Sequence, residues 1–259
     1  INAQTLINWY VVPAGPGTRV KAGLYPTPGT TLIKAIGIGP HRGSIEHKGK
    51  AYFVSGNEFI EMTTGEVFTT ISGTLSTITP RIIMCSNGDF GDQILLVDGT
   101  YGYIFNGSTV AVVSDVDFPA NPTSCVYLDG YAIITTANSG FWYISSLNDF
   151  SGWVATQFAN AEREPDNLVR AYVNGRDLVL FGDYTTEIGT NTGAFPFPFE
   201  MYPNGLMDIG LAARHSVATA GNNVMWLSQD RRGKKQIQIG SGTTYKPLST
   251  LAIDYQIST

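Results

Sequence analysis

Short runs of apolar residues recur along the chain, separated by small turns that contain glycine. Five of these turns stand between a first strand-like run and a second, more apolar one, at Lys48-Gly49, Asn87-Gly88, Asp129-Gly130, Asn174-Gly175 and Ala220-Gly221. The five glycines are 39, 42, 45 and 46 residues apart. Glycine suits such turns because a tight hairpin requires a positive φ, which other residues adopt only with strain. The pattern therefore predicts a repeated structural unit.

The run that follows each glycine turn is apolar throughout, which is typical of a strand covered on both faces. These second runs are residues 51–54, 93–97, 131–135, 178–181 and 223–227. A third run follows each of them, at residues 58–62, 101–105, 141–144, 186–189 and 236–239. A weaker fourth run, such as residues 108–113, closes each unit. Polar and apolar residues alternate more in the third and fourth runs, so we expect these to be outer strands.

Four short antiparallel strands in about 40–50 residues are typical of one blade of a β-propeller. A β-sandwich, the competing all-β fold, would not repeat a strong inner strand at nearly constant spacing. No stretch keeps a helical period of 3.6, so we expect almost no helix. The sequence therefore predicts an all-β propeller of four-stranded antiparallel blades, with five complete blades and residues 41–259 as the blade domain.

The two ends of the chain hold further candidate strands. Residues 8–12 and 31–36 flank a Pro/Gly loop at 25–29, and residues 251–255 start another element. We expect residues 1–40 to contribute to ring closure, because strands from both ends would supply a sixth blade. The first residue is Ile1 rather than Met, which leads us to expect a fragment of a longer protein.

Composition narrows the class of protein. Charged residues make up 14% and hydrophobic residues 43%, with 29 Gly and 13 Pro, which excludes disorder and a coiled coil. A net charge of −5 argues against a nucleic-acid-binding face as the main function. No apolar run reaches 18 residues, so we expect no membrane anchor. The basic cluster at 231–235 is expected to be a solvated hairpin turn, and Cys85 and Cys125 to be buried free thiols.

The sequence carries no nucleophile elbow, P-loop, HExxH or CxxC motif. His41, His47 and His215 lie on or near expected first strands, where a metal site is conceivable, but hydrogen-bonded polar roles are the favoured interpretation. Residues 87–92 resemble a calcium loop, although Asx residues also favour ordinary turns, which we prefer. We therefore assign no catalytic, cofactor-binding or metal-binding residue and expect no enzyme activity and no cofactor.

Two further segments have two interpretations each. Residues 146–153 hold some ingredients of the Asp box of glycosidase propellers, but a turn with Trp153 packed between blades is the plainer interpretation. Residues 195–199 (FPFPF) are expected to form an edge strand or a long outer loop, because proline cannot donate to a strand ladder. Its aromatic rings indicate either a protein contact or packing between blades, and both interpretations stay open.

Ordered motifs along nearly the whole chain resemble a known family. They are residues 6–13 and 24–29 near the start, residues 141–149 in the third unit, and then residues 161–166, 176–182, 185–187, 192–193 and 208–212. In this order they resemble the packaged-DNA stabilisation protein, also called the tail hub or nozzle accessory factor, of short-tailed bacteriophages. Members of that family are longer, so the resemblance implies that the C-terminal part is missing here.

The resemblance implies a structural role in the virion tail, with assembly in the host cytoplasm. The family's proteins form a ring below the portal and adaptor, retain packaged DNA, connect to the needle and tailspikes, and let DNA pass on ejection. The implied partners are these tail proteins and copies of the chain itself, without sequence-specific nucleic-acid binding. A carbohydrate-binding or glycan-cleaving propeller is the main alternative, and an interaction propeller of a cell is another.

Overall fold

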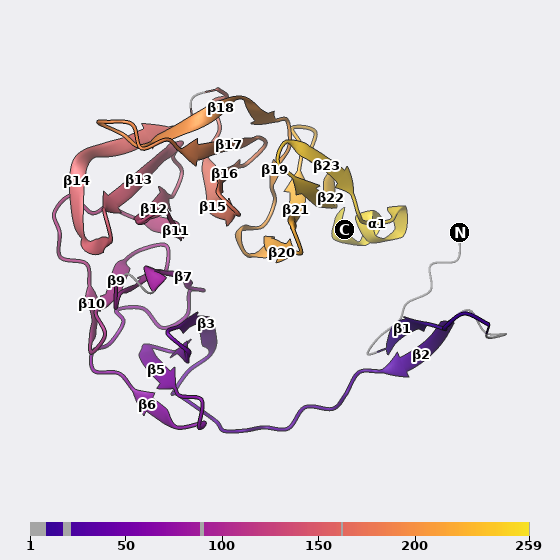
Figure 1. Ribbon diagram of the computed structural model, residues 1–259, viewed down its shortest axis with the longest axis horizontal. Helices are drawn as coiled ribbons and strands as arrows, with labels where there is room; N and C mark the ends of the chain where they lie inside the picture. The colour runs from indigo at the N-terminus through magenta and orange to yellow at the C-terminus, as the bar shows by residue number, and fades with distance from the viewer. Residues whose placement is uncertain (1–8, 18–21, 89–90, 162, 259) are drawn as a thin grey trace. The chain divides into compact units, whose positions relative to one another are not determined.

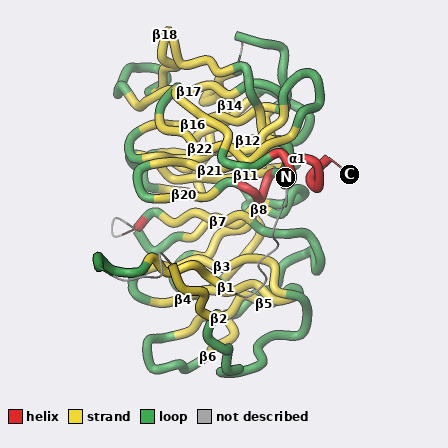
Figure 2. The backbone as a smooth tube through the Cα atoms, turned by 90° about the vertical axis from the view of Figure 1, so that its right-hand side faces the viewer, coloured by secondary structure: helices red, strands yellow, loops and turns green. Residues whose placement is uncertain are grey.

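A computed structural model describes residues 9–17, 22–88, 91–161 and 163–258. Two compact units divide the chain, Ile1–Ala35 and Ile36–Thr259. Strand and loop dominate, and helix is confined to short segments (Figure 2). Within the described residues, no helix has the length and apolar character needed to cross a bilayer.

The first unit is a two-stranded antiparallel ribbon of β1 (Trp9–Pro13) and β2 (Ala22–Pro26). Tyr10 pairs with Tyr25 across the ribbon, and their rings stack with centroids 6.1 Å apart. The expected strand at 8–12 is confirmed for residues 9–12, whereas residue 8 lies outside the described residues. The strand expected at 31–36 is wrong, because those residues do not join a sheet, and a strand exists only through backbone hydrogen bonds to another strand.

The second unit holds five sheets, which we call blades 1 to 5 in chain order (Figure 1). Blade 1 consists of β3 (His41–His47), β4 (Lys50–Ser55), β5 (Glu58–Met62) and β6 (Phe68–Thr70). Blade 2 consists of β7 (Ile83–Ser86), β8 (Ile94–Val97), β9 (Gly102–Phe105) and β10 (Val110–Val112). Blade 3 consists of β11 (Pro122–Leu128), β12 (Tyr131–Thr136), β13 (Phe141–Ser146) and β14 (Asp149–Asn160).

The last two blades follow the same plan with one interruption. Blade 4 consists of β15 (Leu168–Asn174), β16 (Asp177–Gly182), β17 (Thr186–Asn191) and β18 (Phe199–Met207). In blade 5 the first strand is split into β19 (Gly210–Leu211) and β20 (Ala218–Ala220), which both pair with β21 (Asn223–Gln229) around a 3-10 turn, η2 (Arg214–Ser216). The blade is completed by β22 (Lys235–Ser241) and β23 (Thr244–Pro247).

Strand order within the blades follows chain order and every pairing is antiparallel. The predicted five blades, with their second and third runs, are therefore confirmed. The hairpin glycines have the positive φ that the pattern required, for example 75° at Gly49 and 95° at Gly130. First strands of neighbouring blades contact one another from blade 1 to blade 4, and β19 of blade 5 contacts β16 of blade 4. The fourth strands lie on the opposite, outer side of the row (Figure 1).

Antiparallel pairing divides the turns between two faces of the blades. We call the side with the first-to-second-strand and third-to-fourth-strand turns the hairpin face. The side with the second-to-third-strand turns and the links between blades is the connection face. Each turn thus has a predictable side once its place in the blade is known.

Neighbouring blades pack through apolar side chains of their sheets. Tyr52 and Phe59 of blade 1 meet Phe105 of blade 2 with ring centroids 5.2 and 5.4 Å away. Three more clusters join blades 2 and 3, blades 3 and 4, and blades 4 and 5. The second strands of the middle blades are buried on both faces, as predicted, whereas β4 and β21 of the end blades alternate between buried and half-buried residues.

Besides the five blades, the described residues form a sixth, partial sheet, β1–β2, and the expected role of residues 1–40 in ring closure stays a prediction. The C-terminal element expected to add a strand is instead the helix α1 (Leu251–Ser258). Its Asp254 accepts hydrogen bonds from Ser249 and from Gln236 of β22, the latter at 2.6 Å. The bond to Gln236 holds the helix beside β22, although the apolar run of the segment is compatible with a strand.

Candidate functional site

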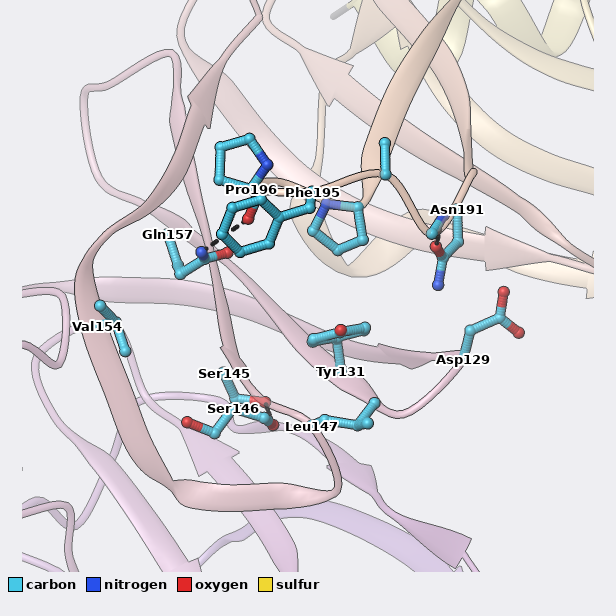
Figure 3. Close-up of a pocket in the computed structure, with 13 residues that line it drawn as sticks. Asp129, Tyr131, Ser145, Ser146, Leu147, Val154, Gln157, Asn191, Phe195 and Pro196 are labelled. Carbon is cyan, nitrogen blue, oxygen red and sulfur yellow. Dashed lines mark hydrogen bonds between the residues drawn. The ribbon is translucent and has the colours of Figure 1, made fainter.

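A pocket of about 550 Å³ lies between blades 3 and 4 on the hairpin face (Figure 3). It is lined by Asp129, Tyr131, Ser145, Ser146, Leu147, Val154, Gln157, Asn191, Gly193, Ala194, Phe195, Pro196 and Pro198. The residues come from β12, β13, β14, the end of β17, the loop that leads to β18, and the hairpin turns before β12 and before β14. The site therefore depends on the packing of two blades and on the outward reach of β14.

The wall from blade 4 is the predicted aromatic segment at 195–199. Its loop contains a cis peptide bond at Phe195-Pro196, and the Pro196 carbonyl accepts a hydrogen bond of 2.9 Å from Gln157 Nε2. The Pro198 carbonyl accepts one of 2.7 Å from the backbone N–H of Thr192. Of the two predicted alternatives, the outer loop is confirmed for residues 195–198, and Phe199 begins the edge strand β18.

The three phenylalanines of this segment have different environments. Phe197 and Phe199 pack edge-on against Trp142 of blade 3, with ring centroids 5.1 and 5.8 Å away. Packing between blades is therefore confirmed for these two rings. Phe195 is 96% exposed and stands at the pocket (Figure 3), and its role as a protein contact stays a prediction.

The pocket can bind but offers no pair of groups for catalysis among its lining residues. Asp129 is its single carboxylate, and Arg176 lies 3.6 Å from it. Ser145 Oγ accepts a hydrogen bond from the Ala132 backbone and donates one to the Ser146 carbonyl, so it has no base beside it. Glycoside hydrolysis needs two carboxyl groups on one sugar, which this lining does not supply. Aromatic rings beside amides and a carboxylate suit the recognition of a polar ligand.

The loop at 87–92 is held as a turn by its own side chains in the part that the structure describes. Asn87 is buried, and its Oδ1 accepts a 3.0 Å hydrogen bond from the Gln93 backbone. Asp92 pairs with Lys48 of the neighbouring blade, and this pairing lowers the pKa of Asp92. Residues 89 and 90 lie outside the described residues. The preferred interpretation as a turn agrees with these bonds.

The segment at 146–153 is a hairpin turn followed by a packed tryptophan. Asp149 accepts hydrogen bonds from the Ser151 backbone at 2.9 Å and from Gln93 of blade 2 at 3.0 Å. Burial alone would raise the pKa of Asp149, but these bonds outweigh it and lower the pKa. Trp153 is buried between blades 2 and 3 and meets Phe118 edge-on at 5.0 Å. The predicted packing of Trp153 between blades is confirmed.

The three histidines do not share a site in the structure. His47 is buried and its Nδ1 lies 3.0 Å from Ser86 Oγ, as expected of a hydrogen-bonded histidine. His41 begins β3, and His215 lies in η2 rather than on the predicted first strand, because that strand is interrupted there. No group of three or more His, Cys, Asp or Glu suited to a metal ion occurs among the described residues.

Both cysteines are buried free thiols, as predicted. Cys85 lies in β7 and Cys125 in β11, on the first strands of adjacent blades. Burial, followed by the hydrogen bond with Cys125, raises the pKa of Cys85. The Cys85 thiol is therefore not activated as a nucleophile.

Sequence reasoning missed a buried charged network between blades 1 and 2. The Arg42 guanidinium donates hydrogen bonds to the carbonyls of Pro80, Thr77 and Gly56 at 2.6 to 2.7 Å. Its Nη2 also lies 3.8 Å from Asp98 Oδ2, and both side chains are almost fully buried. The residues are 56 positions apart along the chain, so no local motif marks the pair.

Comparison with known proteins identifies the family of this chain and supports its fold. The family described as bacteriophage P22 Gp10, beta-propeller, matches residues 2–259. No curated protein matches the sequence. The predicted β-propeller fold is thereby confirmed for the blades described above.

Solved structures share the fold at low sequence identity. The extracellular domain of the hybrid two-component system BT4673 from B. thetaiotaomicron aligns with a TM-score of 0.56 at 10% identity, over 94% of this chain and 34% of that one. The designed protein Ika8 aligns with a TM-score of 0.51 at 10% identity, over 95% of this chain and 71% of Ika8. BamB from Moraxella catarrhalis aligns with a TM-score of 0.50 at 11% identity, over 80% of this chain and 64% of BamB. This chain thus spans about a third of the BT4673 domain.

Proposed function

Because this chain belongs to the phage stabilisation family of β-propeller proteins, we propose that it is a structural component of a phage tail hub. In this role it extends or plugs the portal channel, retains packaged DNA and takes part in ejection. It works in the virion, in contact with the portal or adaptor ring and with the needle or tailspikes. Copies of the chain form a ring there.

The observation that carries the proposal is the family match across residues 2–259. A structural role is also supported by the pocket, whose lining residues lack a catalytic pair. The net charge of −5 supports a conduit, since a uniformly basic surface would grip phosphates and slow translocation.

The surface we assign to a tail neighbour is the loop around Phe195 on the hairpin face. Phe195 is 96% exposed, so a large apolar area of its ring is in contact with water. Burying that area against a partner lowers the free energy of the complex. Gln157 and Thr192 hold the loop by hydrogen bonds to Pro196 and Pro198, so the ring is presented without a large loss of loop entropy. A hydrophobic anchor on a braced loop is typical of interface hot spots.

The test uses the full-length gene product mixed with the portal and adaptor proteins encoded in the same genome. We expect co-sedimentation and a ring-shaped addition to the portal end in electron micrographs. Phe195→Ser should weaken this assembly at least tenfold. Val116→Ser is the matched control, because Val116 is 95% exposed on another loop and should assemble like wild type. Failure of the unaltered full-length protein to join the portal–adaptor complex would overturn the proposed tail role.

A second candidate function is carbohydrate binding in the same pocket. The observation that favours it is the combination of the Tyr131 and Phe195 rings with Asp129, Asn191 and Gln157 (Figure 3). Aromatic faces with nearby amide and carboxylate groups suit sugar rings. A glycan array, followed by titration of hits with Tyr131→Ala, tests it. The absence of binding at millimolar sugar would refute this second function and leave the tail role unaffected.

A further inference from the structure

A cluster of cationic side chains lies along the first strands of the blades, outside the pocket described above. Arg170 lies in β15 of blade 4, and Arg214 and His215 form part of η2 in blade 5. Arg81 stands two residues before β7 of blade 2. Arg170 is the third residue of its first strand, η2 interrupts the first strand of blade 5, and Arg81 precedes the first strand of blade 2. First strands lie on the inner side of the row of blades (Figure 1).

Two of these arginines hold each other in place. Arg170 Nη1 donates a hydrogen bond of 2.8 Å to the Arg214 carbonyl, and Arg214 Nε donates one of 3.1 Å to the Val169 carbonyl. The Arg170 guanidinium also lies 5.5 Å from the centre of the Tyr172 ring. Both guanidinium groups are thus fixed by backbone atoms and an aromatic face, with further N–H donors left to bind a ligand.

The cluster has no counter-charge among the described residues. Every ion pair in that part of the chain uses a different cation: Arg42, Lys48, Lys50, Arg176 or Arg231. Arg170 Nε is buried without a hydrogen-bond partner. Burial lowers the pKa of Arg170 and Arg214, and burial with the charges of Arg170, Arg81 and Arg214 lowers the pKa of His215. Partly buried like charges without an anion are unfavourable, so a bound anion would stabilise them.

The blade repeat allows Arg214 to be compared with an arginine that has an ion-pair partner. Arg42, Arg81 and Arg214 each stand seven residues before the hairpin glycine of their blade, which is Gly49, Gly88 or Gly221. In blade 1 this arginine has the buried Asp98 carboxylate beside it. In blade 5 the equivalent Arg214 has Arg170 beside it instead. The same position therefore carries a structural ion pair in one blade and, among the described residues, a charge without an ion-pair partner in another.

We propose that Arg170 and Arg214, with Arg81 and His215 at its edge, form a binding site for a phosphate group. Guanidinium forks pair with anions that present several acceptor oxygens, and several converging cations suit phosphate better than a two-oxygen carboxylate. The phosphate belongs either to a free phosphate ion or to a nucleic-acid backbone. The site is a local exception in an acidic chain. The inference does not depend on the proposed tail role, because it concerns one ligand group and no assembly.

The experiment titrates inorganic phosphate into the folded chain at pH 7.5 and low salt. The imidazole proton signals of His215 report binding at the cluster, and a His215→Gln variant identifies them. Arg214→Gln removes a central cation. Arg81→Gln removes an exposed one whose loss should leave the fold intact. Arg232→Gln is the matched control, because Arg232 is also exposed, lies in the turn between β21 and β22, and has the same charge.

We expect saturable phosphate binding that Arg214→Gln weakens about tenfold or more, the usual effect of losing one charge-assisted hydrogen bond. Arg81→Gln should weaken it several-fold and Arg232→Gln should leave it unchanged. If a thymidine 12-mer displaces the phosphate, the site is assigned to a nucleic-acid backbone. If the 12-mer leaves the phosphate bound, the site is assigned to free phosphate. No saturable shift of His215, or equal losses in Arg81→Gln and Arg232→Gln, would overturn the proposal.

Discussion

The buried pair of Arg42 and Asp98 gives the most informative stability prediction. Asp98 accepts four hydrogen bonds, two from the backbone of Thr100 and Tyr101 and two from the hydroxyls of Thr77 and Tyr103. Asp98→Asn preserves the shape of the side chain and removes its charge. The Arg42 side chain is only 1% exposed and then lacks a counter-ion.

The expected loss is large because the remaining charge stays buried. Removing one partner of a buried ion pair costs about 3–5 kcal/mol, whereas an exposed pair contributes about 0–1 kcal/mol. We therefore expect Asp98→Asn to lower the free energy of unfolding by about 3 kcal/mol. Asp92→Asn is the matched control, because Asp92 pairs with Lys48 on the surface with 67% of its side chain exposed.

The assay is urea unfolding followed by tryptophan fluorescence, since Trp142, Trp153 and Trp226 are buried. Burial alone would raise the pKa of Asp98, but its hydrogen bonds outweigh burial and lower the pKa. A lowered folded-state pKa stabilises the protein above the unfolded-state value of 3.8, and this stability is lost as the pH falls through the folded-state pKa. Wild type should thus lose stability below about pH 4. Asp98→Asn should lose less stability over the same pH range, because it has no carboxylate at position 98 to protonate. Equal unfolding free energies for Asp98→Asn and Asp92→Asn would refute this reasoning.

Three further predictions concern the hairpins, the thiols and the aromatic segment. Gly130 has a φ of 95°, so Gly130→Ala should lower the free energy of unfolding by about 1–2 kcal/mol. Gly65 lies in open space, so Gly65→Ala should change that free energy by less than about 0.5 kcal/mol. Thermal melts of the two variants measure the difference. Because burial raises the pKa of Cys85, a disulfide reagent at pH 8 should label the native protein far more slowly than the unfolded one, and equal rates would contradict its burial. Phe199→Ala should cost about 3–5 kcal/mol, whereas Phe195→Ala should cost less than about 0.5 kcal/mol, as urea titrations would measure; similar losses would contradict their different exposure.

Local sequence signals were sufficient for the blades but not for the ends of the chain. The hairpin turns at Gly49 and Gly130 follow from local backbone requirements, and the strands on either side follow from apolar runs. The segment 31–36 is as apolar as a strand, yet it has no strand partner. The segment 251–255 is part of a helix whose Asp254 accepts a hydrogen bond from Gln236 of β22. Apolar pattern alone does not distinguish these outcomes, since the deciding contacts come from elsewhere in the chain.

The candidate sites depend still more on distant contacts. The aromatic segment at 195–199 was visible in the sequence, but its division into packed and exposed rings follows from the position of Trp142 in the neighbouring blade. Arg170 and Arg214 are 44 residues apart, and neither belongs to a recognisable motif. Only the packing of blades 4 and 5 brings them together.

The sequence by itself determined the repeat, the hairpins, the strand order within each blade and the resemblance to a phage family. These depend on interactions within about 50 residues, which apolar spacing and glycine positions encode directly. The tertiary structure decided which second strands are covered on both faces, since β8 is buried throughout while β21 at the end of the row alternates. It also decided which charge has an ion-pair partner within the described part of the chain, as Arg42 does, and which has none there, as at Arg214. Burial and counter-charge are properties of neighbours in space, so the pattern of one strand cannot specify them.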